Sequence, residues 1–91
     1  MKNVMRKTLT GGWTEFEFDQ VCKHYFVKNY SDGDIYVSFD ENDDEDESCK
    51  ISSGVGEEIA TTFREYDRNE DYTDTIYVKG TGEVEVQQLD I

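Results

Sequence analysis

The stretch Thr75-Ile76-Tyr77-Val78-Lys79-Gly80-Thr81-Gly82-Glu83-Val84-Glu85-Val86-Gln87 decides the fold. Its first part, residues 75–79, is rich in β-branched and aromatic residues, which are typical of strands. Its last part, residues 83–87, alternates acidic and apolar residues, so Val84 and Val86 point to one face. The glycines of the intervening Gly80-Thr81-Gly82 favour a turn. We therefore expect two strands joined by a turn.

Similar patterns recur along the rest of the chain. Residues 13–18 alternate aromatic and acidic residues, and residues 24–30 are rich in β-formers. Residues 34–39 alternate so that Ile35, Val37 and Phe39 face a core while Tyr36 and Ser38 face away. The Asp-Gly pair in residues 31–33 predicts a hairpin between the second and third of these runs. Residues 49–52 form a further short strand in this reading.

Residues 55–66 fit two structures. Ile59, Phe63 and Tyr66 have the spacing of an amphipathic helix, whereas Thr61 and Thr62 are β-branched. We favour a strand there. Six to seven short strands separated by turns predict an all-β fold, a small antiparallel β-sandwich or jelly-roll-like barrel.

The charge of the chain is unevenly distributed. The 91 residues carry a formal net charge of −13, and residues 40–47 alone hold seven acids and no base. Like charges at this density repel each other and resist burial, so we expect a solvated acidic loop over residues 40–48. Residues 1–12 instead carry Lys2, Arg6 and Lys7 and no acid. We expect a flexible basic arm over residues 1–12, followed by a single β domain over residues 13–91.

Composition excludes several classes of protein. No apolar run has the length of a membrane span, and the negative charge argues against ordinary nucleic-acid binding. The aromatic content of 13% is too high for a wholly disordered acidic chain. Cys22 and Cys49 lack the spacing of a zinc site, and we favour small buried thiols over a disulfide. We therefore expect a folded acidic domain without a membrane span.

Chemistry-bearing motifs are scarce. The lone His24 lies in an aromatic strand and has the character of a structural residue. Phosphate-loop, dinucleotide and serine-nucleophile motifs are missing from the sequence, so we expect a protein that is not an enzyme. Residues 67–74 offer oxygen ligands for a calcium site, but lack the glycine and final glutamate of an EF-hand. The candidate ligands are Asp67, Asn69, Asp71 and Asp74.

Several of these runs together resemble a known family. The runs are Val27-Lys28-Asn29, residues 34–39, Lys50 to Gly54 and residues 76–84, within a region from about Phe26 to Val86. They resemble small accessory structural proteins of tailed bacteriophages and of prophages of Gram-positive gut bacteria. The resemblance implies a non-catalytic virion component, made in the bacterial cytoplasm, such as a capsid decoration or head-fibre-like subunit. It also implies capsid or tail proteins as partners and a homo-oligomeric state.

Two other functions remain open at this point. An acidic protein can inhibit a nucleic-acid-binding protein by imitating the phosphates of DNA. A calcium- or carbohydrate-binding sandwich would use the acids above or exposed aromatic residues such as Trp13. For the virion component, the candidate contact residues are the basic residues of the N-terminal segment and two outward strand tyrosines: Lys2, Arg6, Lys7, Tyr36 and Tyr77.

Overall fold

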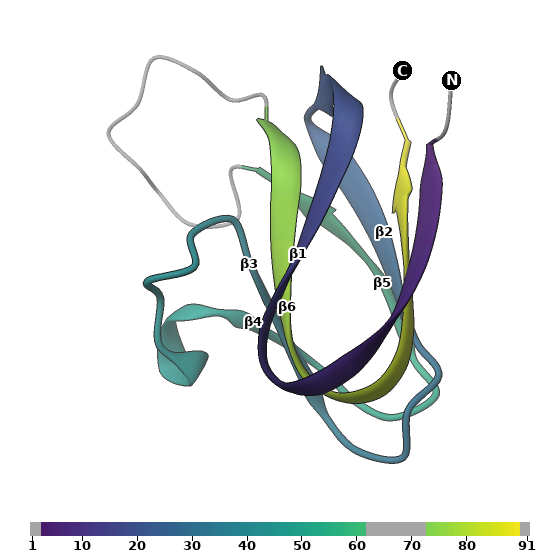
Figure 1. Ribbon diagram of the computed structural model, residues 1–91, viewed down its shortest axis with the longest axis vertical. Helices are drawn as coiled ribbons and strands as arrows, with labels where there is room; N and C mark the ends of the chain where they lie inside the picture. Colours follow the sequence, from purple (N-terminus) through teal and green to yellow (C-terminus); the bar gives the residue numbers. More distant parts are fainter. Residues whose placement is uncertain (1–2, 62–72, 90–91) are drawn as a thin grey trace.

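The chain folds almost entirely into β-strands, as the alternating pattern predicts (Figure 1). The computed structural model describes residues 3–61 and 73–89. The elements in chain order are β1 (Val4–Cys22), β2 (His24–Asn29), β3 (Ile35–Ser38), the single-turn 3-10 helix η1 (Glu45–Glu47), β4 (Cys49–Ile51), β5 (Gly56–Ala60) and β6 (Thr73–Gln88).

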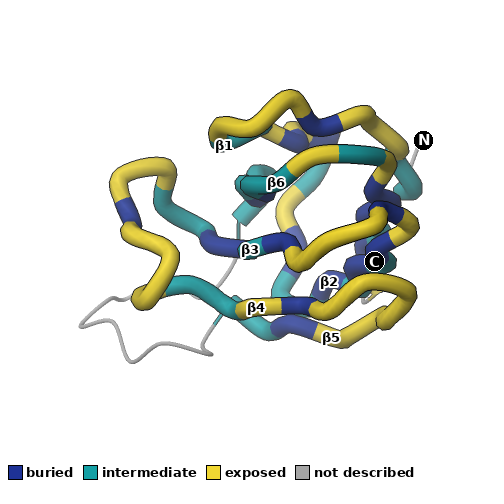
Figure 2. The backbone as a smooth tube through the Cα atoms, turned by 90° about the horizontal axis from the view of Figure 1, so that it is seen from below, coloured by how far each residue is buried: buried dark blue, intermediate teal, exposed yellow. Residues whose placement is uncertain are grey.

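Strand β6 is the centre of the sheet. Its whole length pairs antiparallel with β1 on one side. On its other side, the first half of β6 pairs with β3 and the second half pairs with β2, also antiparallel. β4 pairs with the other side of β3, and β5 pairs with the other side of β2. The sheet therefore has two halves, β1–β6–β3–β4 and β1–β6–β2–β5. These halves fold over a common core and form a nearly closed, barrel-like sheet (Figure 2).

Glycines let β1 and β6 bend from one half-sheet into the other. Gly11 and Gly82 have φ angles of +111° and +95°, which residues with a side chain rarely adopt. The pairing of β1 with β6 shifts its register between Thr10 and Trp13, beside this bend. The expected turn at residues 80–82 is therefore wrong, because these residues bend a continuous strand instead of reversing the chain.

The expected flexible arm is also corrected. Residues 4–12 belong to β1, and Val4 to Thr10 pair in unbroken register with residues 81–87 of β6. Leu9 is buried at 3% exposure and anchors this segment to the core. Pairing along β6 satisfies backbone groups that an arm would leave in water, so the strand continues to residue 4.

The expected hairpin at residues 31–33 does not form. β2 and β3 do not pair with each other, because each lies along a different half of β6. Buried Asn29 holds the crossing between them. Its Nδ2 donates to the Gly33 carbonyl at 2.8 Å and to the Ile51 carbonyl at 3.1 Å, and its Oδ1 accepts from Ser31 N at 2.9 Å. A side chain that bonds nearby backbone in this way replaces a tight hairpin turn.

Three further expectations concern residues 55–66, the two cysteines and the acidic loop. The strand favoured for residues 55–66 is confirmed over Gly56–Ala60, while Phe63 and Tyr66 lie outside the described residues. Neither cysteine forms a disulfide: Cys22 is a buried thiol that donates a hydrogen bond to the His24 carbonyl at 2.9 Å, and Cys49 is a half-buried thiol. The acidic loop is mainly exposed, but Asp43 is 9% exposed and accepts a hydrogen bond from the Ser38 hydroxyl. That bond makes it the exception to a fully solvated loop.

The core lies between the two half-sheets and takes side chains from every strand. Tyr25 and Phe16 are its largest fully buried members, and Phe18 and Phe39 pack on Tyr25 with ring centroids 5.9 Å and 5.8 Å away. The buried hydrophobic residues are Leu9, Phe16, Phe18, Cys22, Tyr25, Val27, Ile35, Val37, Ile51, Ile59, Ile76, Val78, Val84 and Val86.

We expect the substitution Gly82→Ala to lower the free energy of unfolding by about 2 kcal/mol or more. An added Cβ would lie 2.5 Å from the Ser31 Cβ, on a backbone whose φ is +95°. Gly12→Ala is the matched control, because nothing lies within 4 Å of a Cβ there, and it should change stability by less than about 0.5 kcal/mol. Urea unfolding followed by tryptophan fluorescence measures both. Equal losses for the two variants would contradict the role of Gly82 in the bend.

Candidate functional site

A buried carboxylate organises the outer face of the half-sheet formed by β1, β6, β2 and β5. Arg6, Glu85, Lys28 and Gly56 lie in one cross-strand row. The Arg6 Nε donates to Glu85 Oε1 at 2.7 Å, and the Lys28 Nζ lies 3.4 Å from Glu85 Oε2. Glu85 is 5% exposed although it points away from the core, because the two cations cover it.

The electrostatics of this row favour the charged forms of its members. The hydrogen bond from Arg6 is the largest influence on Glu85, and with Lys28 it holds the pKa of Glu85 below its ordinary value despite burial. The same contact raises the pKa of Arg6. Both groups are therefore ionised at neutral pH, and the row is a fixed ion-pair network on the sheet surface.

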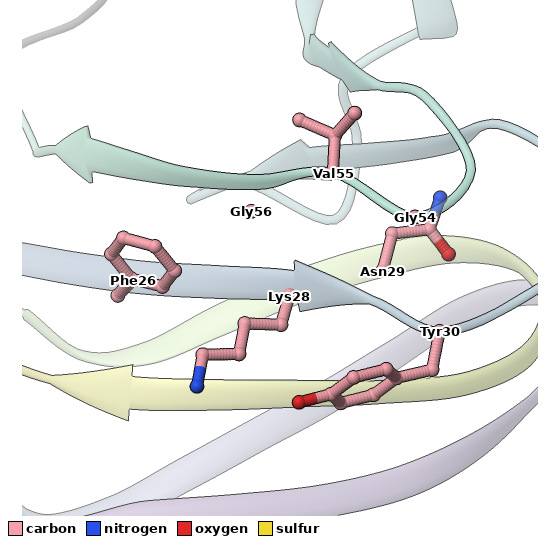
Figure 3. A pocket seen from close by; sticks show the side chains of 7 residues that line it. All are labelled: Phe26, Lys28, Asn29, Tyr30, Gly54, Val55 and Gly56. Carbon is pink, nitrogen blue, oxygen red and sulfur yellow. The ribbon is translucent and has the colours of Figure 1, made fainter.

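A hollow opens where this row ends at Gly56. It has a volume of about 250 Å³, and Figure 3 shows the aromatic ring of Phe26 and the side chains of Lys28 and Tyr30 along it. Gly56 forms part of its floor, since a Cβ there would lie 2.7 Å from the Phe26 ring. The lining residues are Phe26, Lys28, Asn29, Tyr30, Gly54, Val55 and Gly56.

The chemistry of the hollow is apolar and cationic. Tyr30 and Val55 are 54% and 41% exposed, which is high for large apolar side chains. The Lys28 Nζ lies 5.9 Å from the Phe26 ring centroid, within the range of a cation–π contact. An aromatic wall beside an ammonium group can hold an apolar side chain flanked by a carboxylate. We call these residues, Phe26, Lys28, Tyr30, Val55 and Gly56, the β2–β5 hollow.

Two of the expected contact residues lie on the other half-sheet. Tyr36 and Tyr77 are both half-buried on its outer face, as the alternation predicts. Burial and the nearby acids Glu41 and Glu15 raise the pKa of Tyr77. In the cross-strand row of Tyr36, Lys79 places its Nζ 5.9 Å from the Trp13 ring centroid and 3.2 Å from Glu45 Oε2. The acidic loop therefore contacts this face.

The basic residues expected to contact a partner have separate surroundings. Arg6 is bound to Glu85, and its side chain is 65% exposed. The Lys7 Nζ donates to the Glu15 carbonyl at 2.6 Å and lies 5.2 Å from the Phe16 ring centroid. Lys2 lies outside the described residues. The structure thus brings Arg6, but not Tyr36 or Tyr77, to the half-sheet that carries the hollow.

Most of the expected calcium site falls outside the described residues. Asp67, Asn69 and Asp71 lie outside the described residues, while Asp74 accepts a hydrogen bond from the Thr75 hydroxyl at 2.8 Å. Within residues 3–61 and 73–89, the structure has no group of three or more histidine, cysteine or acidic side chains that could hold a metal. Across the same ranges, it also has no helix of the length and apolarity needed to span a membrane.

Sequence reasoning missed the residues that form the hollow. Phe26 and Lys28 alternate along β2 and Tyr30 directly follows it, so the spacing of the three residues was visible in the sequence. Gly56 begins β5 and Val55 precedes it, and only the pairing of β2 with β5 brings them beside Phe26 and Lys28. The alternation could have suggested an outward aromatic face, but not the hollow beside it.

No family model, curated protein or solved structure matches this chain.

We expect Glu85→Gln to destabilise the protein by about 1 kcal/mol at pH 7, because Arg6 and Lys28 lose their shared partner. The folded-state pKa of Glu85 lies below its ordinary value of 4.5, so its stabilising effect is complete above pH 4.5. That effect is lost as pH falls through the depressed pKa, and the difference between variant and wild type should shrink there. Urea unfolding from pH 7 to pH 3 measures it. The control Glu83→Gln, at an exposed site of the same strand, should show no such trend. A difference that persists unchanged at pH 3 would contradict the ion-pair explanation.

Proposed function

We propose that this chain is a non-catalytic protein-binding module, and that it serves as an accessory subunit of a phage particle. The resemblance of residues 26–86 to accessory proteins of tailed phages supports the second part. Capsid decoration and head-fibre-like attachment are the roles that the resemblance suggests. The β2–β5 hollow supports the first part, because it is a concave apolar surface on a small domain.

The observation that carries the proposal is the exposed aromatic and cationic character of the hollow. The protein has a net charge of −13, so a surface with Lys28, Arg6 and two aromatic rings stands out from its surroundings. Tyrosine and arginine are enriched at the centres of protein interfaces because they bury large areas and keep polar ends for hydrogen bonds. Tyr30 has this character, with 54% of its surface exposed.

The partner in this proposal is a capsid or tail protein that presents an extended segment. The hollow lies on the outer face of β2 and β5, so the segment would lie across this face and place one side chain in the hollow beside Gly56. An apolar side chain followed by an acidic one fits the ring of Phe26 and the ammonium group of Lys28.

A particle-binding assay tests this proposal. The double variant Tyr30→Ser/Val55→Ser changes two exposed residues of the hollow and should leave the fold intact. We expect its affinity for particles that lack the protein to fall at least about tenfold, as for loss of an interface hot spot. Val21→Ser/Leu89→Ser is the matched control, since it removes exposed apolar surface elsewhere.

The particles should be purified from a host strain in which this gene is deleted, and wild-type particles should be examined by mass spectrometry. Absence of the protein from wild-type particles would contradict the virion role. Equal binding by both double variants would contradict the role of the hollow. Inhibition of a DNA-binding enzyme by the free protein, without particle binding, would favour DNA mimicry instead.

A further inference from the structure

The two margins of the sheet have complementary strand directions. β1 lies at one margin of the sheet, and β4 and β5 lie at the opposite margin (Figure 2). In the half-sheet β1–β6–β2–β5, every neighbouring pair is antiparallel. β5 therefore runs opposite to β1, and a second copy placed beside β5 in the same orientation would present its β1 antiparallel to β5. Such an addition would continue the sheet from one copy to the next.

The structure shows which residues of each edge strand direct their backbone N–H and C=O groups away from the sheet. Gln88 N donates to the Asn3 carbonyl at 2.8 Å, so odd-numbered residues at the start of β1 turn their backbone groups toward β6. Even-numbered residues, such as Arg6 and Thr8, therefore turn theirs outward. In β5, Asn29 N donates to the Val55 carbonyl at 3.0 Å, so Gly56 and Glu58 turn theirs outward. If these two edges pair, their outward backbone groups bond to each other. Even-numbered residues of β1 must then lie opposite even-numbered residues of β5.

Charge selects one register from those that this phase allows. When Arg6 lies opposite Glu58, Lys7 lies opposite Glu57 and Met5 lies opposite Ile59. Arg6 and Glu58 both belong to the outer face, because they occupy rows with Glu85 and Phe26 respectively. Lys7 and Glu57 both belong to the inner face, in rows with Val84 and Val27. One register therefore matches two opposite charges on each strand, each on its proper face.

The same charges disfavour the other pairings of these edges. Two β1 strands centred on Arg6 or Lys7 would place that cation opposite its own copy, and two β5 strands centred on Glu57 or Glu58 would do the same for that acid. Like charges directly opposite each other destabilise a sheet. The margins of the second half-sheet, β1–β6–β3–β4, also carry opposite charges. Its β1 margin has Glu15 on the outer face and its β4 margin has Lys50. Head-to-tail contact of β1 with β5 is thus the pairing that both margins favour.

We propose that this chain self-associates head to tail, with residues 4–8 of β1 in one copy paired to residues 56–60 of β5 in the next. Arg6 then lies beside Glu58, Lys7 beside Glu57, and Thr8 beside Gly56 at the end of the β2–β5 hollow. The second copy therefore completes one wall of the hollow. This inference rests on the oligomeric part of the proposed function, and such a heterologous contact closes into a ring or continues as a filament.

Sedimentation velocity over a range of concentrations tests the contact. We expect the wild type to form species heavier than its 10.6 kDa monomer. Glu57→Lys and Lys7→Glu should each weaken association about tenfold or more, because each places like charges opposite one another. Mixing the two variants should restore association, because the glutamate introduced at position 7 of one copy then faces the lysine introduced at position 57 of the other. Asp46→Lys, at an exposed residue of η1, is the control with the same change in net charge as Glu57→Lys.

The control separates this contact from general charge repulsion. Glu57→Lys and Asp46→Lys both make the protein less negative, so repulsion alone predicts tighter association for both. The proposal predicts weaker association for Glu57→Lys only. A monomer of 10.6 kDa at all concentrations, or no recovery on mixing two variants that melt as the wild type does, would overturn it. Particle binding through the hollow is measured in a separate assay. A failure to self-associate would therefore contradict the head-to-tail contact without contradicting particle binding.

Discussion

The continuous pairing of β1 with the bent strand β6 is the constraint on which the rest of the structure depends. β6 pairs with β1 along one edge and with β3 and β2 along the other, so it belongs to both half-sheets. A chain of 91 residues buries a small core, and sharing two strands between its halves brings both inner faces onto the same aliphatic and aromatic cluster. The bend at Gly11 and Gly82 makes this sharing possible.

The shared strands also determine where the sheet remains open. Since β1 and β6 lie side by side through the bend, both halves begin at the same β1 margin and end at β4 or β5. Open edges promote uncontrolled pairing unless charge or shape restricts them. In the half-sheet β1–β6–β2–β5, basic residues lie at the β1 margin and acidic residues at the β5 margin. In the other half-sheet the signs are reversed, with Glu15 on β1 and Lys50 on β4, so charge favours contact between opposite margins. The same architecture thus leaves edges open and restricts what can pair with them.

Local sequence patterns predicted the strands but not how they pair. The alternation of apolar and polar residues located the strands, because every second side chain of a strand points to the same face. The pattern at residues 80–82 was misread because a glycine pair permits a bend as readily as a turn, and only a partner as long as β1 decides between them. The crossing at residues 30–34 was misread for a related reason, since buried Asn29 binds Ile51, 22 residues away. The β2–β5 hollow and the row containing Glu85 depend on register between distant strands, which no local pattern contains.

Glu85 lies between the β1 margin and the β2–β5 hollow. The row from Arg6 through Glu85 and Lys28 to Gly56 crosses the half-sheet from the β1 margin to the β5 margin. Glu85 is buried between its cations, so it restrains Arg6 at one margin and Lys28 beside the hollow. Restraint before binding lowers the conformational entropy lost at an interface. A carboxylate on the outer face therefore has a structural reason to be buried: it holds the positive groups of Arg6 and Lys28 in place on the sheet surface.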